Sequence, residues 1–177
     1  EPGGQGSIHF SILSGETSTQ VFVGGDRQPA GFEDKEGFPN AIGAVNYSGR
    51  LFRGDSSVTA TGLAPSPQWK HLTHVLDAGS MTGGGTASSS SHNADSRDMA
   101  HDAAGDLIES DDGGIYVRTS PSNNKGDWFS INGNLQITEQ HSIAYDPVSN
   151  IIISGNQDTG TAQQSVAGSL VWDTVSQ

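Results

Sequence analysis

Four side chains within residues 92–98 are of types that bind metals or transfer protons: His92, Asp95, Arg97 and Asp98. A histidine grouped with carboxylates can bind a divalent cation. The same residues can supply an acid and a base, because Arg97 would keep one aspartate ionised while a crowded neighbour has a raised pKa. A third interpretation is structural, with an Asp–Arg pair and Asx turns ordering a long loop. Residue types and spacing leave all three interpretations open.

Two short turns carry further candidates. Residues 111–114 are Asp-Asp-Gly-Gly, and residues 156–160 are Asn-Gln-Asp-Thr-Gly. Carboxylates in such turns can bind calcium or a sugar hydroxyl, which makes Asp112 and Asp158 the candidate metal ligands. The alternative, favoured because the pattern occurs twice, is a tight turn with glycine at positive φ. Asp111 and Gln157, one residue earlier, are freer to contact a ligand.

The elements that position these residues are predicted to be short β-strands. Apolar runs of about four to six residues occur along the chain, separated by Gly, Ser, Asn, Asp or Pro. Helical periodicity is hard to find. This pattern is typical of an all-β chain.

An internal repeat organises the predicted strands. The segment that begins at Met99 matches the one that begins at Ile143, and Trp128 matches Trp172, so two independent markers share an offset of 44 residues. A looser match extends the repeat toward the N-terminus. The result is three units of four strands, with an insertion in the first unit (27–47) and a long segment before the second (74–97). The units are residues 8–73, 97–132 and 141–176.

Units of this size are typical of β-propeller blades, which are four-stranded sheets stacked around an axis. The sequence therefore predicts an all-β fold of about three antiparallel blades in one β-propeller segment, residues 1–177, with a β-sandwich as the alternative. In a propeller, the loops before each first strand and the loops between strands two and three meet on one face, where ligands bind. The candidate ligand-binding residues on that face are Asp26, Arg27, His92, Arg97, Glu139, His141 and Gln157.

Composition narrows the possible partners. The formal net charge of −12 excludes a nucleic-acid partner, which needs a basic surface, and disfavours anionic membranes. No apolar run approaches 18 residues, so no membrane insertion is predicted. The chain has no cysteine, which excludes disulfides and thiolate metal sites. Calcium or a cationic partner fits this acidic composition better.

Residues 111–120, 128–135 and 143–160 resemble the repeats of Asp-box (bacterial neuraminidase repeat) propellers. The family motif is Ser-x-Asp-x-Gly-x-Thr-Trp; here residues 122–128 are one residue short and have Asn in place of Asp. The resemblance is best over 92–176 and weaker over 8–73. It is similar in kind to propellers of the xyloglucanase and sortilin types and to repeats of large secreted bacterial proteins.

The resemblance implies a secreted module, extracellular or at the cell surface, that binds a neutral glycan or a protein at the channel mouth, with or without calcium. The alternative is a glycoside hydrolase of the xyloglucanase-like type, which would use two carboxylates from among Asp95, Asp98 and Asp111. A structural segment of a large adhesin-like protein is a third possibility. Since fold alone does not decide function, all three are kept.

Three blades are fewer than the four to eight with which propellers close. Open sheet edges associate unless they are paired. We therefore expect either a homodimer that completes a six-bladed ring or the remaining blades in a longer chain. Residues 1–4 do not resemble a signal peptide and are expected to be a mature or truncated end.

Overall fold

The computed structural model describes residues 6–27, 48–63, 66–73, 85–135, 138–157 and 160–176. These residues form twelve strands and no helix, so the predicted all-β class is confirmed. Within them, nothing helical has the length and apolar character needed to cross a bilayer. The chain divides into two compact units, Glu1–Leu135 and Gln136–Gln177, and each is described by itself.

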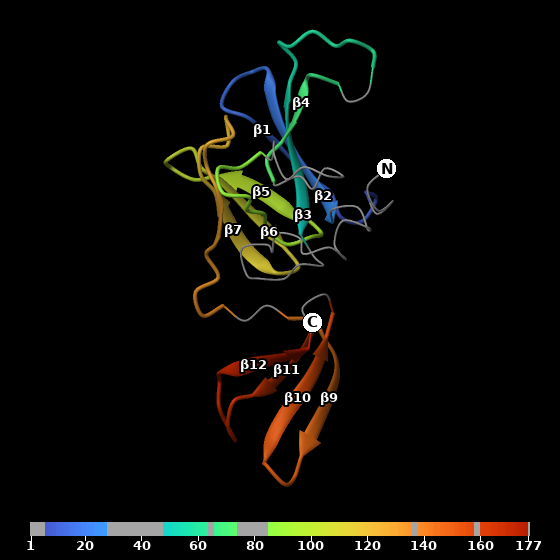
Figure 1. Cartoon of the computed structure of the whole chain (residues 1–177), viewed down its shortest axis with the longest axis vertical. Coiled ribbons are helices and arrows are strands. Elements are labelled where there is room, and N and C mark those ends of the chain that lie inside the picture. The colour runs from blue at the N-terminus through green and yellow to red at the C-terminus, as the bar shows by residue number, and fades with distance from the viewer. Residues whose placement is uncertain are drawn as a thin grey trace. The chain divides into compact units, whose positions relative to one another are not determined.

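Each strand is hydrogen-bonded to the next along the chain, which gives three four-stranded antiparallel sheets (Figure 1). The predicted four-stranded antiparallel units are therefore present. The first unit contains two of the sheets. These are β1 (Ser11–Ser14), β2 (Gln20–Arg27), β3 (Gly49–Asp55) and β4 (Trp69–His71), followed by β5 (Asp98–His101), β6 (Leu107–Asp111), β7 (Gly114–Arg118) and β8 (Trp128–Ser130).

The second unit is a single sheet of β9 (Gln140–Asp146), β10 (Ile151–Asn156), β11 (Gly160–Gln164) and β12 (Trp172–Ser176). The 44-residue repeat aligns it with the sheet before it, because Trp128 opens β8 and Trp172 opens β12. The turns after the first strands also agree. Asp102 accepts a hydrogen bond from Ala104 N, and Asp146 accepts one from Val148 N.

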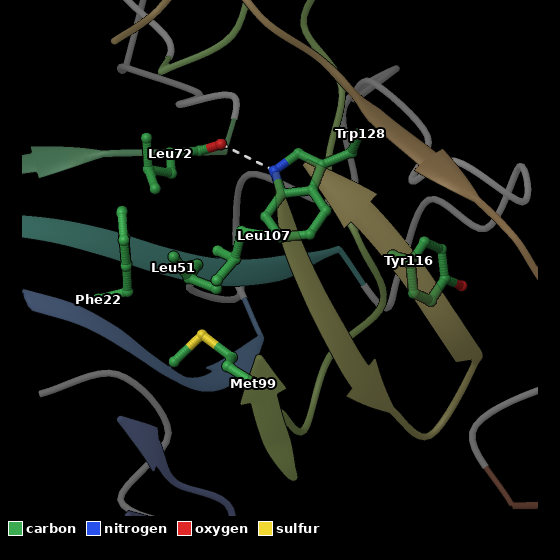
Figure 2. Packing of buried hydrophobic residues seen from close by; sticks show 7 residues of the cluster. All are labelled: Phe22, Leu51, Leu72, Met99, Leu107, Tyr116 and Trp128. Atoms are coloured by element: carbon green, nitrogen blue, oxygen red, sulfur yellow. Dashed lines mark hydrogen bonds between the residues drawn. The ribbon is translucent and has the colours of Figure 1, made fainter. Parts of the chain in front are cut away.

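The core of the first unit lies between its two sheets. Alternate residues of a strand point to one face, and this face supplies one buried apolar cluster, drawn in Figure 2. It contains Phe22, Leu51, Leu72, Met99, Leu107, Tyr116 and Trp128. All but Met99 and Trp128 are fully buried, and those two are 6% and 2% exposed. This cluster is the buried apolar core of the described part of the first unit.

The main chain of Leu72, just after β4, ties the two sheets together. Its carbonyl oxygen accepts a hydrogen bond of 2.8 Å from Trp128 Nε1 (Figure 2) and one of 3.3 Å from Arg118 Nε. The buried Arg118 guanidinium also donates to the carbonyl oxygens of Gly85 and Asn123, at 2.6 and 3.0 Å. Burial lowers the pKa of Arg118 to about 10, so it stays charged at neutral pH.

Residues 85–91 lead from this junction toward β5 and are held by Asp127. One oxygen of the Asp127 carboxylate accepts hydrogen bonds from Ser88 N at 2.9 Å and from Ser90 Oγ at 2.7 Å. Ser90 Oγ in turn accepts one from Trp128 N at 2.9 Å. Burial acts to raise the pKa of Asp127, but these hydrogen bonds and Arg118 outweigh it and hold that pKa below its usual value.

Replacing Asp127 by asparagine should therefore weaken the fold and change its response to acid. The carboxylate of the folded state has a lowered pKa, so its stabilisation is present above about pH 4 and is lost as the pH falls through the folded-state pKa. We expect Asp127→Asn to lower the free energy of unfolding by about 1 kcal/mol at pH 7, because a charged hydrogen bond becomes a neutral one. The decrease in the free energy of unfolding between pH 5 and pH 2.5 should be smaller for Asp127→Asn than for the unaltered chain.

Urea unfolding across that pH range, followed by tryptophan fluorescence, measures both effects. Asp173→Asn is the control, since Asp173 is exposed on β12. An Asp127→Asn chain with an unchanged acid response would contradict the assignment.

Candidate functional site

His92 lies in the centre of the first unit and is fully buried. The loop that carries it pairs with the start of β3, where Gly49 N donates to His92 O at 2.9 Å and Ser91 Oγ donates to Gly49 O at 3.1 Å. The His92 ring packs against the Trp128 ring, with 4.6 Å between centroids. A Cβ added at Gly49 would lie 2.3 Å from His92 Cε1. Only glycine therefore leaves room for this imidazole.

Two carboxylates face His92 from the second sheet. Leu107, Glu109 and Asp111 are the buried alternate residues of β6. Glu109 Oε2 lies 3.3 Å from His92 Nδ1, and Asp111 Oδ2 lies 3.1 Å from the same nitrogen. All three side chains have 0% exposure. We call His92, Glu109 and Asp111 the buried polar cluster.

The electrostatics of this cluster are those of charges removed from water. Burial by itself lowers the pKa of His92, but the Glu109 and Asp111 carboxylates outweigh it and raise that pKa to about 10. Burial, reinforced by the negative charge of Glu109, raises the pKa of Asp111 to about 8 against the opposing effect of His92. Both His92 and Asp111 therefore favour their protonated forms at neutral pH.

The cluster also has too few hydrogen-bond donors. Within the residues that the structure describes, neither carboxylate oxygen of Glu109 accepts a hydrogen bond, and His92 Nε2 has no partner. The buried hydroxyl of Tyr116 is likewise unpartnered there, and Figure 2 shows it pointing away from the apolar side chains. Native proteins rarely leave so many buried polar atoms unpaired at one place.

Arg97 and Asp112 form an ion pair at the rim of the same sheet. Arg97 donates to Asp112 Oδ1 through Nη2 at 2.6 Å and through Nε at 3.0 Å. Asp112 lies in the turn between β6 and β7, where Gly114 has a φ of 125°; Gly160, at the start of β11, has a φ of 79°. The geometry at Asp112 is that of the tight-turn interpretation. Asp158, the second candidate metal ligand, lies outside the described residues.

The remaining candidates of the segment 92–98 do not share a centre with His92. Asp98 is exposed, and its Oδ1 accepts a hydrogen bond from Met99 N at 2.9 Å, within its own strand. Asp95 has a φ of 68°, and its Oδ2 lies 3.9 Å from His9 Nε2. The proposed acid–base set is therefore divided between a buried centre, a strand end and the neighbourhood of His9.

A separate pocket of about 190 Å³ lies beside His9. It is lined by the segment before β1, by the second half of β2 and by the first half of β3. Its side-chain lining includes His9, Phe10, Val23, Asp26, Arg50 and Phe52. We call it the Asp26 pocket. Asp26 is one of the candidate ligand-binding residues, whereas the neighbouring Arg27 contacts it through its main chain, with Arg27 N donating to Asp26 Oδ1 at 2.7 Å.

Three buried polar atoms of residues that line the Asp26 pocket have no hydrogen-bond partner in the described part of the chain. Asp26 Oδ2, Arg50 Nε and His9 Nδ1 are buried without a hydrogen bond among the described residues. Burial lowers the pKa of Arg50 although the Asp26 carboxylate acts to raise it. The Arg50 guanidinium lies 5.8 Å from the centroid of the Phe52 ring, a cation–π distance. The pocket thus combines charge, aromatic surface and unused hydrogen-bonding capacity.

In the second unit the candidates lie together at one end of the sheet. Glu139 Oε1 lies 3.2 Å from His141 Nε2, and both side chains are exposed. Gln157 N donates to Glu139 O at 2.9 Å. Within this sheet, then, the loop before the first strand meets the loop between the second and third strands.

Several residues of these two sites were not candidates in the sequence: Glu109, His9, Phe10, Arg50 and Phe52. Glu109 lies in residues 107–111, where two adjacent apolar residues, Leu107 and Ile108, are followed by three polar ones. Two neighbouring apolar residues leave the buried face of a strand undecided. The alternation of Leu107, Glu109 and Asp111 was the one available signal.

Comparison with protein-family models, with curated proteins and with solved structures finds no match to this chain.

Replacing Gly49 by alanine should displace His92 and destabilise the first unit. The added Cβ would lie 2.2 Å from the main-chain oxygen of Asn93 as well as 2.3 Å from the His92 ring. Trp128 packs against that ring, so it has little room to move. Overpacking of this kind costs about 1–3 kcal/mol, measured by urea unfolding.

Gly6→Ala is the matched control, because a Cβ there would have nothing within 4 Å. It should leave the free energy of unfolding within about 0.5 kcal/mol. Equal stabilities for the two variants would show that His92 is not confined as described.

Proposed function

We propose that this chain is an extracellular ligand-binding module built from β-propeller blades and that the Asp26 pocket binds a neutral glycan. The observation that carries the proposal is the pocket lining, in which the polar residues His9, Asp26 and Arg50 stand beside the rings of Phe10 and Phe52. Binding sites characteristically combine apolar surface with a few convergent polar groups.

A sugar residue matches both the apolar surface and the polar groups of this lining. Its C–H face can pack on the exposed ring of Phe10, which is 51% exposed. Its hydroxyls can hydrogen-bond with Asp26 and Arg50 once small side-chain rotations bring their buried atoms Asp26 Oδ2 and Arg50 Nε, which have no partner among the described residues, to the pocket surface. The volume is below the roughly 300–1,000 Å³ of pockets for drug-sized ligands, so it suits one sugar residue or a chain end.

Charge selects against acidic sugars. The chain carries a formal net charge of −12, which repels anions at a distance, and Asp26 places a carboxylate in the pocket itself. A neutral glycan avoids both penalties.

The propeller part of the proposal is supported by topology. Each sheet is a four-stranded antiparallel meander, which is the form of a propeller blade, and the 44-residue repeat and the resemblance to Asp-box repeats point the same way. Either a second copy or further blades of a longer chain would complete the ring.

The glycoside hydrolase alternative has less support from the geometry. The Asp111 carboxylate is fully buried beside His92, so a polysaccharide would not reach it. The Asp98 carboxylate is engaged with the first peptide N–H of its own strand. Neither is placed to flank a glycosidic bond in the way that hydrolysis requires.

Binding to an array of neutral and acidic oligosaccharides tests the proposal, followed by titration calorimetry with the best neutral ligand. We expect Phe10→Ala and Asp26→Asn each to weaken binding about tenfold or more, because tenfold corresponds to about 1.4 kcal/mol, the scale of one important contact.

Phe129→Ala is the matched control for Phe10→Ala. Phe129 has the same 51% exposure but lies on β8, outside the pocket, and its loss should leave affinity unchanged. The proposal fails if no neutral glycan binds, as for a module that binds protein, or if the three variants behave alike.

A further inference from the structure

The buried polar cluster places two carboxyl groups against one histidine in the interior of the first unit. Glu109 and Asp111 are both carboxylates, and among the described residues no lysine or arginine forms an ion pair with either one. His92 is the single cationic group within ion-pair distance of them there. Isolated buried charge is costly unless it is paired or binds a metal.

We propose that His92, Glu109 and Asp111 form a binding site for one divalent zinc ion. The ion would take the place of the protons in the cluster, with both carboxyl groups ionised and His92 uncharged. It would also use the Glu109 oxygens, which have no hydrogen-bond partner among the described residues although the side chain is fully buried. No residue of this site lines the Asp26 pocket, so the inference stands apart from the proposed glycan binding.

The distances already fit ligands of a single ion. Oxygen and nitrogen ligands lie about 2.0–2.2 Å from zinc in a tetrahedral arrangement, which places two ligand atoms roughly 3.3–3.6 Å apart. His92 Nδ1 is 3.3 Å from Glu109 Oε2 and 3.1 Å from Asp111 Oδ2. The donor atoms of all three residues lie within 4.8 Å of one another. Small side-chain shifts would complete the geometry.

The donor set selects the kind of metal. Calcium and magnesium prefer oxygen ligands alone, whereas an imidazole nitrogen with carboxylates suits zinc. Full burial indicates a site that stabilises structure, because a substrate could not reach the ion. Metal binding would then be coupled to folding of the first unit.

Titration calorimetry of the untagged 177-residue chain, freed of metal by chelation, tests the site with Zn²⁺ and with Ca²⁺. We expect tight binding of Zn²⁺ and no binding of Ca²⁺ at His92, Glu109 and Asp111. At a hundredfold excess over Kd, Zn²⁺ should raise Tm by about 5–10 °C. Glu109→Gln should weaken Zn²⁺ binding about 100-fold or more, since even residues that only support ligands contribute 10–100-fold.

Glu139→Gln is the matched control. Glu139 also has a carboxylate oxygen beside a histidine, at 3.2 Å from His141 Nε2, but the pair is exposed. The Zn²⁺ affinity that Glu109→Gln removes should survive in Glu139→Gln. Absence of Zn²⁺ binding, or its loss only in Glu139→Gln, would overturn the proposal and identify the cluster as a hydrogen-bonded group around a protonated histidine.

A second measurement does not depend on folding of the Glu109 variant. In a chain with Trp69→Phe and Trp172→Phe, Trp128 is the remaining tryptophan, and its ring lies 4.6 Å from that of His92. Paramagnetic Co²⁺, a common substitute for zinc, should strongly quench Trp128 fluorescence at one equivalent, and excess Zn²⁺ should restore it. Unquenched fluorescence at saturating Co²⁺ would contradict the site.

Discussion

The main-chain oxygen of Leu72 is the point on which the first unit depends. It accepts hydrogen bonds from Trp128 on β8 and Arg118 on β7, while Leu72 N donates to Leu51 O on β3 at 2.8 Å. One residue thus joins the outer strand of the first sheet to two strands of the second. Because the buried apolar share is small, these polar links fix how the sheets meet, and the loop that carries His92 begins from the same junction.

Two kinds of buried charge share the inner face of the second sheet, and they are satisfied very differently. Arg118 stands opposite Leu107, and Glu109 stands opposite Tyr116, in the β6–β7 register. The Arg118 guanidinium is surrounded by main-chain oxygens that accept its hydrogens. Glu109 has no comparable set of donors in the described residues. The fold supplies hydrogen-bond acceptors for the buried Arg118 guanidinium but few donors for the buried Glu109 carboxylate. This difference agrees with the proposal that a cation binds Glu109.

Much of this architecture could be predicted from the sequence, because turns and short apolar runs are local signals. The strands, their grouping in fours and the 44-residue period all follow from such signals, and Trp128 and Trp172 occupy equivalent strand starts. The partners of side chains could not be predicted in the same way. Arg97 pairs with Asp112 rather than with the aspartates beside it in sequence, since pairing depends on a turn folding back over a loop. How the two sheets of the first unit pack against each other is likewise set by long-range contacts.

The three sheets also show that the buried polar cluster is not a requirement of the fold. The register places Gly24 of β2 opposite Ser11 and Glu109 of β6 opposite Met99, at matching positions of the first pair of strands. In the third sheet Ser154 pairs with Ile143, the residue that matches Met99, so Ser154 stands where the second sheet has Glu109. A glycine or a serine is therefore compatible with this position of the sheet, and burying a carboxylate there has a desolvation cost that a small neutral residue avoids. Such a local departure from the pattern of the repeat is expected where a site performs a task beyond packing, which agrees with a cation-binding role for Glu109 and its partners.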